Sequence, residues 1–336
     1  MSGYRRSLYF VAPRQVVVRE EPLPTLAGGQ MLVEVVRSAI SPGTEMVVYR
    51  GQVPRDMPLD ASISALASTA EFPVKYGYAA VGRVVELGAG VSSEWLGKLV
   101  MALHPHESHF VAIPSELRPV PVGVTAEEAA FLPNVETAVT FLMDGQPIVG
   151  EHVAVFGQGV VGLLTTALLA RLPLSCLVTV DRHALRRGWS LDLGAHRAVD
   201  PSAPAELRRL RSFFDLTYEL SGSPAALDEA ISVTGFCGRV VIGSWYGDRH
   251  AELNLGGAFH RSRMQLTASQ VSTIAPQWEG RWSMARRLEV AWRMLQDLRP
   301  ARLVTHRFAF SRAADAYDLI DRCPGEAVQV ILTYDA

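Results

Sequence analysis

Cysteine is scarce in this chain, with three residues among 336. Cys176, Cys237 and Cys323 show no CxxC spacing, and each lies in or beside an apolar run. A disulfide framework and a cysteine-rich zinc site are therefore not expected. We expect reduced, buried thiols, which are typical of a cytoplasmic protein.

Long apolar runs and an excess of one charge are also lacking. No run reaches the roughly 18 residues that a membrane-spanning helix needs, and the N-terminal segment lacks the apolar core of a signal peptide. The formal net charge is −2, so the composition offers no basic excess for nucleic acid or an anionic membrane. We therefore expect a cytoplasmic protein with no nucleic-acid partner and no membrane span.

The composition is that of a folded protein, because 49% of the residues are hydrophobic and 20% are charged. Residues 1–121 consist of short β-rich runs broken by Pro and Gly, which predicts a mostly β domain. Thr125 followed by Glu128 predicts a capping box at the start of a helix. From Glu151 onward strands and helices alternate, which predicts an α/β domain with a parallel sheet and helices on both faces.

The segment VAVFGQGVVG carries a GxGxxG pattern at Gly157, Gly159 and Gly162. The pattern follows a β run and opens an apolar helix, which is the context that a dinucleotide-binding turn requires. The first glycine permits the tight turn, the second lets the backbone approach a pyrophosphate, and the third lets helix and strand pack closely. We predict that a dinucleotide binds at this turn, which comprises Gly157, Gln158, Gly159, Val160, Val161 and Gly162.

A second signal concerns the choice between NAD and NADP. Asp181 ends the next strand, about 20 residues beyond the glycines, where an acid accepts hydrogen bonds from the adenosine ribose hydroxyls. An acid at this position favours NAD, because it would repel the 2′-phosphate of NADP. Arg182 follows immediately and could stack on adenine or pair with a phosphate, so NADP remains an alternative.

The order of these features resembles the medium-chain dehydrogenase/reductase superfamily, which includes the zinc alcohol dehydrogenases. MLVEVVRSAISPGTEMVVYRG is similar to the segment that carries the first zinc ligand, and YGYAAVGRVVELGAGV to the GHExxGxV segment. HRFAFSRAADAYDLI resembles the closing strand and helix. The resemblance implies a GroES-like, mostly β catalytic domain at residues 1–121 and 304–336. A Rossmann domain, residues 122–303, would be inserted between its two parts.

The chain departs from the zinc enzymes at the positions where the resemblance places metal ligands. Ser41 and Pro42 stand in place of the first Cys, and Tyr78 and Ala79 stand in place of the His-Glu pair. The four-cysteine structural loop is missing. Because zinc prefers thiolate and imidazole ligands in a tetrahedral array, we expect no zinc in this protein.

Three histidines, His104, His106 and His109, could be considered as a substitute metal site. Their spacing brings at most two of them together, with no thiolate nearby, so we do not expect a metal there. The segments ISPGTE, Pro105-His106 and GSWYG most resemble a zinc-free branch of the superfamily. That branch includes the bacteriochlorophyllide dehydrogenases, which oxidise a hydroxyethyl group on a chlorin to acetyl.

The resemblance also suggests catalytic residues. Tyr78, in the position of a zinc ligand, would face the nicotinamide and donate a proton or polarise a carbonyl, or it would simply fill the vacated metal site. Glu45 stands where the zinc enzymes keep an acid, and would be a general base or a structural partner of Arg50 or the backbone. His106 is a third catalytic candidate and Tyr49 a weaker one, both expected in exposed loops.

The order of strands and helices in the family implies further cofactor contacts. Thr137 lies in a helix that should approach the nicotinamide, and Gly243, Ser244 and Trp245 follow a strand whose end should border the cofactor. Trp245 could equally wall an aromatic substrate or pack between domains. Members usually pair through the edge strand of the Rossmann sheet, so residues 264–269 are predicted to form a homodimer contact.

Three functions remain open at this point. The leading hypothesis is a zinc-independent NAD(P)-dependent oxidoreductase that transfers hydride between nicotinamide and an alcohol or ketone group of a small molecule, with a chlorin as one candidate. An alternative is a reductase of an activated C=C bond. A hypothesis from another class is a dinucleotide-binding sensor or scaffold without turnover.

Overall fold

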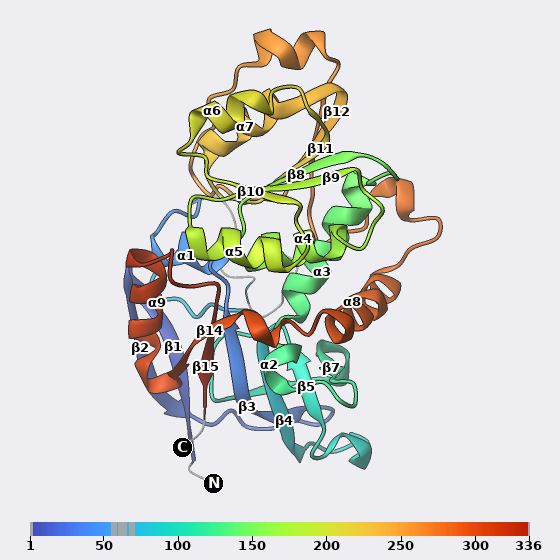
Figure 1. Cartoon of the computed structure of the whole chain (residues 1–336). Coiled ribbons are helices and arrows are strands. Elements are labelled where there is room, and N and C mark those ends of the chain that lie inside the picture. The colour runs from blue at the N-terminus through green and yellow to red at the C-terminus, as the bar shows by residue number, and fades with distance from the viewer. Residues whose placement is uncertain (1–2, 55–58, 60–65, 67–70, 335–336) are drawn as a thin grey trace. The chain divides into compact units, whose positions relative to one another are not determined.

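The computed structural model describes residues 3–54, 59, 66 and 71–334 (Figure 1). The chain forms two compact units, residues 1–133 with 299–336, and residues 134–298. The divisions fall after Pro133 and Leu298 rather than after residues 121 and 303. The first unit keeps α2 (Ala126–Ala129), because this helix packs against two strands of the first unit, β3 (Met31–Ile40) and β4 (Ala80–Leu87).

The first unit is built on a seven-stranded sheet with the order β14-β15-β3-β4-β5-β7, in which β6 also pairs with β3. A separate antiparallel pair is formed by β1 and β2. The strands of this unit are β1 (Tyr4–Ala12), β2 (Gln15–Pro22), β3 (Met31–Ile40), β4 (Ala80–Leu87), β5 (Leu99–Ala102), β6 (His109–Ala112), β7 (Leu117–Pro119), β14 (Val304–Ala309) and β15 (Gln329–Thr333).

Two short helices complete the core of the first unit. The helix α9 (Ala313–Arg322) buries Ala313, Ala316, Tyr317 and Ile320, a helical spacing that places one apolar stripe against β2 and β14. The helix α1 (Thr44–Tyr49) is buried from its second residue onward and contacts α9. The remaining short elements here are η2 (Ser93–Trp95), η3 (Pro114–Glu116), η6 (Pro300–Leu303) and η7 (Phe310–Arg312).

The second unit contains a parallel sheet with the order β10-β9-β8-β11-β12-β13 (Figure 1). Its central strands are almost wholly apolar, as expected for strands covered on both faces. The strands are β8 (His152–Phe156), β9 (Cys176–Val180), β10 (Arg197–Val199), β11 (Phe214–Glu219), β12 (Thr234–Ile242) and β13 (Gln265–Ala268).

Helices precede, connect and follow these parallel strands, which confirms the predicted α/β fold class with a mostly β part and a doubly wound parallel sheet. They are α3 (Leu132–Gly145), α4 (Val160–Leu169), α5 (Ala184–Asp192), α6 (Pro204–Arg209), α7 (Pro224–Val233), η4 (Leu255–Phe259), η5 (Pro276–Trp278) and α8 (Met284–Leu298). Within the described ranges, no helix is long and apolar enough to cross a membrane.

Two local predictions have clear outcomes. The capping box is confirmed, because Thr125 Oγ1 accepts from the Glu128 N–H at 3.2 Å and the Glu128 carboxylate accepts from the Thr125 N–H at 2.9 Å. The prediction of buried thiols is wrong for Cys237 and Cys323, which are exposed, and Cys176 is half-buried. Cys237 lies in a left-handed turn inside β12, and Cys323 caps the exposed end of α9, so neither side chain points into a core.

Candidate active site

Three hydroxyl groups meet in the first unit, in the segments to which the family resemblance assigned metal ligands. The Tyr78 hydroxyl donates a hydrogen bond to Ser41 Oγ and lies 3.3 Å from Thr44 Oγ1. Antiparallel pairing of β3 with β4 places the end of one strand beside the start of the other, which brings Ser41 and Tyr78 together. Tyr78 is half-buried, so this hydroxyl trio combines a fixed phenol with two further groups that can donate or accept a proton.

Glu45 lies directly behind the trio and is completely buried. Its Oε1 accepts a hydrogen bond from the Ser41 backbone N–H at 2.8 Å, and its Oε2 lies 3.0 Å from His106 Nε2 and accepts from the Tyr317 hydroxyl. Burial and the neighbouring Glu45 carboxylate raise the pKa of the Tyr317 phenol well above its usual value, so Tyr317 stays protonated and donates. Three donors therefore hold the carboxylate. Arg50, considered above as its partner, pairs instead with Asp321 at 2.7 Å.

The expectation that His106 and Tyr49 lie in exposed loops is wrong. His106 is completely buried, and Tyr49 is 4% exposed and stacks on Tyr317 with ring centroids 5.4 Å apart. Backbone hydrogen bonds from Leu8 N–H to the His106 carbonyl, and from His106 N–H to the Tyr76 carbonyl, fix the loop against two other segments. These long-range contacts decide the burial of His106.

The His106 ring is enclosed on three sides. Its Nε2 faces Glu45, which only accepts, so a proton lies on Nε2. Its Nδ1 lies 2.7 Å from Ser38 Oγ, and the Tyr334 hydroxyl lies 2.8 Å from the same Oγ. A Cβ at Gly77 would lie 2.5 Å from the ring, and Gly77 has a φ of +115°, so this position requires glycine.

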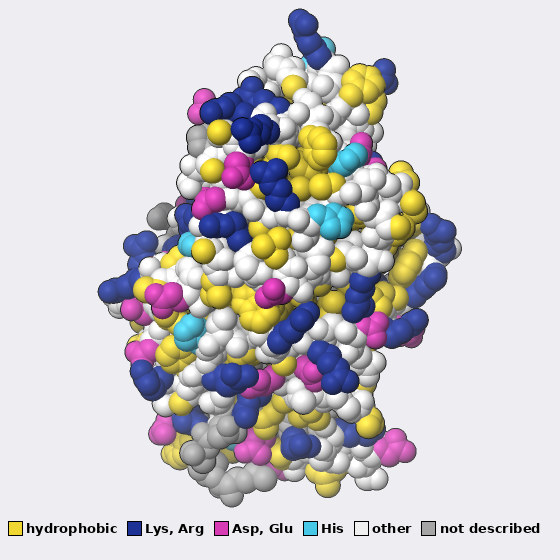
Figure 2. Space-filling model, viewed as in Figure 1, with side chains coloured by type: hydrophobic (Ala, Val, Ile, Leu, Met, Phe, Trp, Pro, Cys, Tyr) yellow, Lys and Arg dark blue, Asp and Glu magenta, His cyan; other side chains and the backbone are white. Residues whose placement is uncertain are grey.

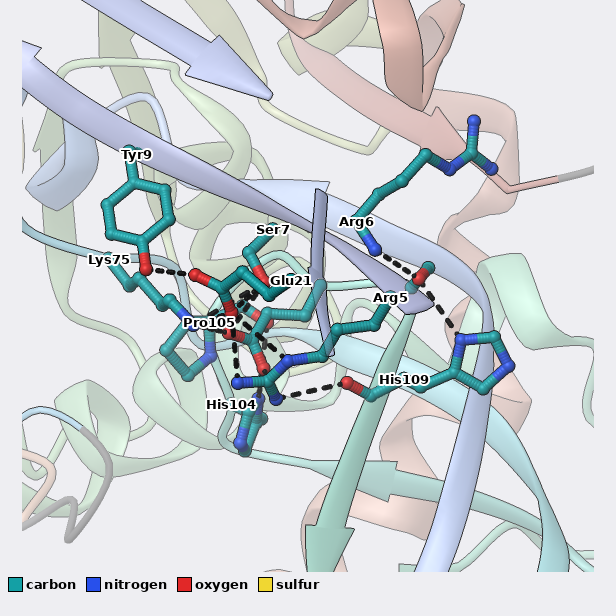
Figure 3. Close-up of polar contacts among 11 residues, drawn as sticks. Arg5, Arg6, Ser7, Tyr9, Glu21, Lys75, His104, Pro105 and His109 are labelled. Carbon is teal, nitrogen blue, oxygen red and sulfur yellow. Dashed lines mark hydrogen bonds and ion pairs between the residues drawn. The ribbon is translucent and has the colours of Figure 1, made fainter. Parts of the chain in front are cut away.

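A charged cluster supports the two loops that carry these residues (Figure 3). Lys75 Nζ pairs with Glu107 at 2.6 Å and with Glu21 at 2.7 Å, and Arg5 pairs with Glu107 at 2.8 Å. Lys75 lies three residues before Tyr78, and Glu107 follows His106. The ion pairs therefore tie both site loops to β1 and β2. Burial opposes ionisation of Glu21, but hydrogen bonds from Lys75 and Tyr9 lower its pKa to about 2.

The other two histidines of this loop have different surroundings. His104 stacks on Phe110 with ring centroids 4.1 Å apart, and His109 lies 3.1 Å from Ser108 Oγ. Burial lowers the pKa of both imidazoles, so they are neutral at pH 7. In the part of the chain that the structure describes, no three His, Cys, Asp or Glu side chains form a group that could hold a metal ion.

The three glycines of the glycine turn in the second unit differ in the space that a side chain would find there. A Cβ at Gly157, which has a φ of +86°, would lie 2.4 Å from Ser221 Cα, and one at Gly162 would lie 2.0 Å from the Gly157 carbonyl oxygen. These two glycines are needed for packing of the turn itself. A Cβ at Gly159 would meet no atom within 4 Å, so this position faces open space at the start of α4. A pyrophosphate can approach the backbone there.

Asp181 is buried at the end of β9, beside the turn. Its Oδ2 accepts from the Gln158 backbone N–H at 2.7 Å, and its Oδ1 accepts from the His183 N–H at 2.8 Å. The Gln158 side chain points inward, donates to the Val155 and Gly157 carbonyls and accepts from Thr166, so it braces the turn from behind. Arg182 is exposed, with Nε 3.1 Å from His183 Nε2.

Sequence analysis missed Glu219, which forms a second polar group with Ser244 and Tyr246 at the carboxyl ends of β11 and β12. Glu219 is buried, accepts from the Ser221 N–H at 2.8 Å, and accepts from the Tyr246 hydroxyl at 2.5 Å. Ser244 Oγ accepts from the Gly222 N–H at 2.8 Å. The sequence signal that could have revealed this group is Glu219 itself, an acid at the end of the strand FDLTYE. This group adjoins Gly157 through Ser221, so the glycine turn and the ends of both strands form one site.

The remaining predicted cofactor residues take these positions. Val160 is buried and Val161 is half-buried at the start of α4, and Thr137 is half-buried in α3. Gly243 packs closely against Phe141, because a Cβ added at Gly243 would lie 2.3 Å from the Phe141 ring. Trp245 follows β12 and is half-buried. The structure places the glycine turn, Asp181 and Ser244 at the carboxyl edge of one parallel sheet. Ligands bind at this edge in doubly wound folds.

A mostly β unit interrupted by a doubly wound parallel-sheet unit, with a glycine turn at the carboxyl edge of the strands, defines the class of dinucleotide-binding oxidoreductases. No family model matches the chain. D-guloside 3-dehydrogenase of Escherichia coli (strain K12) is 23% identical over 354 residues, which cover 98% of this chain and 100% of that protein. L-threonine 3-dehydrogenase of Xanthomonas campestris pv. campestris (strain B100) is 22% identical over 265 residues, 69% of this chain and 74% of that protein.

Solved structures are also similar. The short chain alcohol dehydrogenase RspB of Escherichia coli CFT073, complexed with NADH, has a TM-score of 0.80 at 20% identity, covering 99% of this chain and 100% of that one. A zinc-binding dehydrogenase of Sinorhizobium meliloti 1021, bound to NADP, has a TM-score of 0.77 at 18% identity, covering 98% and 99%. The chain therefore has the fold of the medium-chain dehydrogenases, which confirms the resemblance to that superfamily at the level of the fold.

Proposed function

We propose that the protein is an NAD(P)-dependent dehydrogenase that oxidises an alcohol, or reduces the matching ketone, on a small molecule without using zinc. The observation that carries this proposal is the hydroxyl trio of Tyr78, Ser41 and Thr44, which stands where the zinc enzymes keep metal ligands. A zinc ion stabilises the substrate oxygen by its charge. A phenol held by two further hydroxyls stabilises the same oxygen by hydrogen bonding instead.

The glycine turn fits a dinucleotide. Gly159 offers open backbone at a helix N-terminus, and Asp181 presents a carboxylate fixed by two backbone N–H groups. We assign the pyrophosphate to residues 157–162 and the adenosine ribose to Asp181, with NAD favoured and Arg182 as the residue through which NADP could be accepted. When bound, the nicotinamide accepts or supplies the hydride.

In this proposal Tyr78 is the proton donor and acceptor for the substrate oxygen. In alcohol oxidation the C–H bond releases a hydride and the O–H bond releases a proton, which leaves through the hydroxyl trio. Glu45 and His106 do not touch the substrate in this assignment, because both are completely buried and already bonded to each other. They hold the Ser41 backbone, and with it the Ser41 hydroxyl, in position.

The substrate class is inferred from the relatives that the chain resembles. The two curated relatives are by name dehydrogenases of a guloside and of threonine, so we favour a secondary alcohol over an activated C=C bond. A hydroxyethyl group on a chlorin is a second candidate substrate, because the segments ISPGTE and Pro105-His106 resemble the bacteriochlorophyllide dehydrogenases. We also propose a cytoplasmic location, and a homodimer through β13, an edge strand whose side chains are mostly exposed.

The experiment that tests the proposal is a calorimetric titration of metal-analysed protein with NADH and, in parallel, NADPH. We expect zinc-free protein to bind NADH more tightly, and alcohol screening to yield a ketone. Tighter binding of NADPH would overturn the assignment of Asp181. Binding of neither dinucleotide would remove the enzymatic proposal, and a product with a saturated C–C bond would replace it with C=C reduction.

A further inference from the structure

Four large apolar side chains are exposed at one edge of the parallel sheet in the second unit. Ile148 and Val149, which precede β8, are 61% and 75% exposed. Phe213, directly before β11, is 42% exposed, and Phe236, at the start of β12, is 73% exposed. Because the strands are parallel, their starts lie at the same edge, opposite the carboxyl edge that holds the glycine turn.

Hydrogen bonds join the loops of this edge into one surface. The Arg239 side chain donates to the carbonyls of Gly145 and Gln146, at the start of the loop that carries Ile148 and Val149. The Phe213 N–H donates to the Val233 carbonyl at 2.8 Å, just before Phe236. The Cys237 N–H donates to the Ser262 carbonyl at 2.7 Å. We call the surface formed by loops 145–151, 208–213, 235–238 and 260–263 the apolar–basic edge.

Exposed arginines lie in the loops of the same edge. Arg208, Arg209, Arg211, Arg261 and Arg263 are all exposed, and among the described residues none of them forms an ion pair. Three acids of this region already have partners, because Asp215 faces His152, Glu206 pairs with Arg197 and Glu151 pairs with Arg239. Figure 2 shows a group of Lys and Arg side chains over α6, next to a group of hydrophobic side chains. The net charge of −2 conceals this local concentration of positive charge.

The backbone of the apolar–basic edge is also unusual. Six described residues other than glycine have a left-handed φ, and four of them lie in these loops: Gln146, Ser212, Cys237 and Arg263. Such conformations cost free energy for residues with a side chain and gather at functional sites. Here they occur in each of the four loops, where they shape the turns that present the exposed side chains.

We infer that the apolar–basic edge docks the protein on an anionic phospholipid surface. Unpaired arginines are attracted to the negative headgroups, and exposed Phe, Ile and Val side chains at loop tips can enter the boundary between headgroups and acyl chains. A second copy of the chain fits less well, because a two-fold contact would place the same arginines opposite one another. A nucleic acid would pair with the arginines but would leave the aliphatic Ile148 and Val149 in water.

The test is sedimentation of the full chain with vesicles of phosphatidylcholine alone or mixed with phosphatidylserine. We expect binding to the mixed vesicles, little binding to phosphatidylcholine alone, and loss of binding as salt screens the charges. Arg211→Gln should lower the partition coefficient about fivefold, since one basic residue near such a surface contributes about 1 kcal/mol. Phe236→Ser should lower it at least about tenfold.

Matched controls are Arg293→Gln on the exposed face of α8 and Leu96→Ser, an exposed apolar position in the first unit. Both should bind vesicles as the unchanged protein does, and thermal unfolding of all four variants should show that they are folded. Absence of binding to anionic vesicles overturns the inference, as does equal loss in the control variants. Binding of single-stranded RNA without vesicle binding, or a change of oligomeric state in Phe236→Ser, would assign the edge to another partner and also overturn it.

Discussion

The Tyr317 hydroxyl donates a hydrogen bond to the buried carboxylate of Glu45, although 272 positions separate the two residues in the chain. The donor comes from α9 near the C-terminus, and the acceptor lies in α1, which follows β3. Because Glu45 also holds the Ser41 N–H, this contact links the last helix of the first unit to the hydroxyl trio. A carboxylate with no exposed surface depends on each of its donors.

Removal of this donor is the first prediction. Tyr317→Phe should lower the free energy of unfolding by about 1–3 kcal/mol, because it leaves one oxygen of a buried carboxylate with a missing donor. Urea denaturation measures the change. Tyr4→Phe, at a side chain that is 60% exposed, is the matched control and should cost little. Equal stability of Tyr317→Phe and the unchanged protein would contradict the assignment of Tyr317 as a structural donor.

Tyr78→Phe tests the proton role of the phenol. The variant keeps the ring and its packing but removes the hydroxyl that bonds Ser41 and Thr44. We expect turnover of an active alcohol substrate to fall about 10²–10⁴-fold while the dissociation constant for NADH stays the same. Steady-state kinetics and calorimetry together give the two numbers. Unchanged turnover would show that Tyr78 only fills the vacated metal position.

Gly77→Ala tests the close approach between Gly77 and His106. The new Cβ would lie 2.5 Å from the imidazole ring at a backbone with φ of +115°. Strain and overlap should together lower the free energy of unfolding by about 2–5 kcal/mol. Gly123→Ala separates the two effects, because Gly123 has a φ of +86° but no atom within 4 Å of a Cβ. A similar loss for both variants would mean that the contact with His106 contributes nothing.

Two glycines of the dinucleotide turn should respond differently to alanine. Gly159→Ala should leave the melting temperature of the free protein nearly unchanged, because its Cβ enters open space, but should weaken NADH binding. Gly162→Ala should lower the melting temperature, because its Cβ would lie 2.0 Å from the Gly157 carbonyl oxygen. Calorimetric titration and thermal unfolding distinguish the two. The assignment of the pyrophosphate to this turn fails if Gly159→Ala binds NADH normally.

Glu21 gives a prediction for pH. Its pKa in the folded protein is about 2, below its ordinary value of 4.5, so its ionised form stabilises the fold. This contribution is present above pH 4.5 and is lost as the pH falls towards about 2. Urea denaturation across this range should show a steeper loss of stability for the unchanged protein than for Glu21→Gln. Parallel pH profiles would mean that the charged cluster of Figure 3 does not depend on Glu21.

Local patterns in the sequence determined much of the second unit and, in the first unit, the start of α2. The glycine turn joins a strand to the helix that follows it directly, and the capping box at Thr125 spans four consecutive positions, so neighbours in sequence suffice to form both. Alternating strands and helices likewise predicted the parallel sheet. Asp181 could be placed because it ends the next strand of the same repeating unit.

Only the tertiary structure decided the surroundings of Glu45 and His106. Their partners Ser38 and Tyr317 lie on β3 and α9, and Tyr334, which bonds Ser38, lies just beyond β15. No local periodicity specifies which distant segments will meet. For the same reason the sequence suggested an exposed His106 and buried thiols, which the structure contradicts. Burial and charge density depend on packing between distant segments, whereas turns and capping boxes depend on adjacent residues.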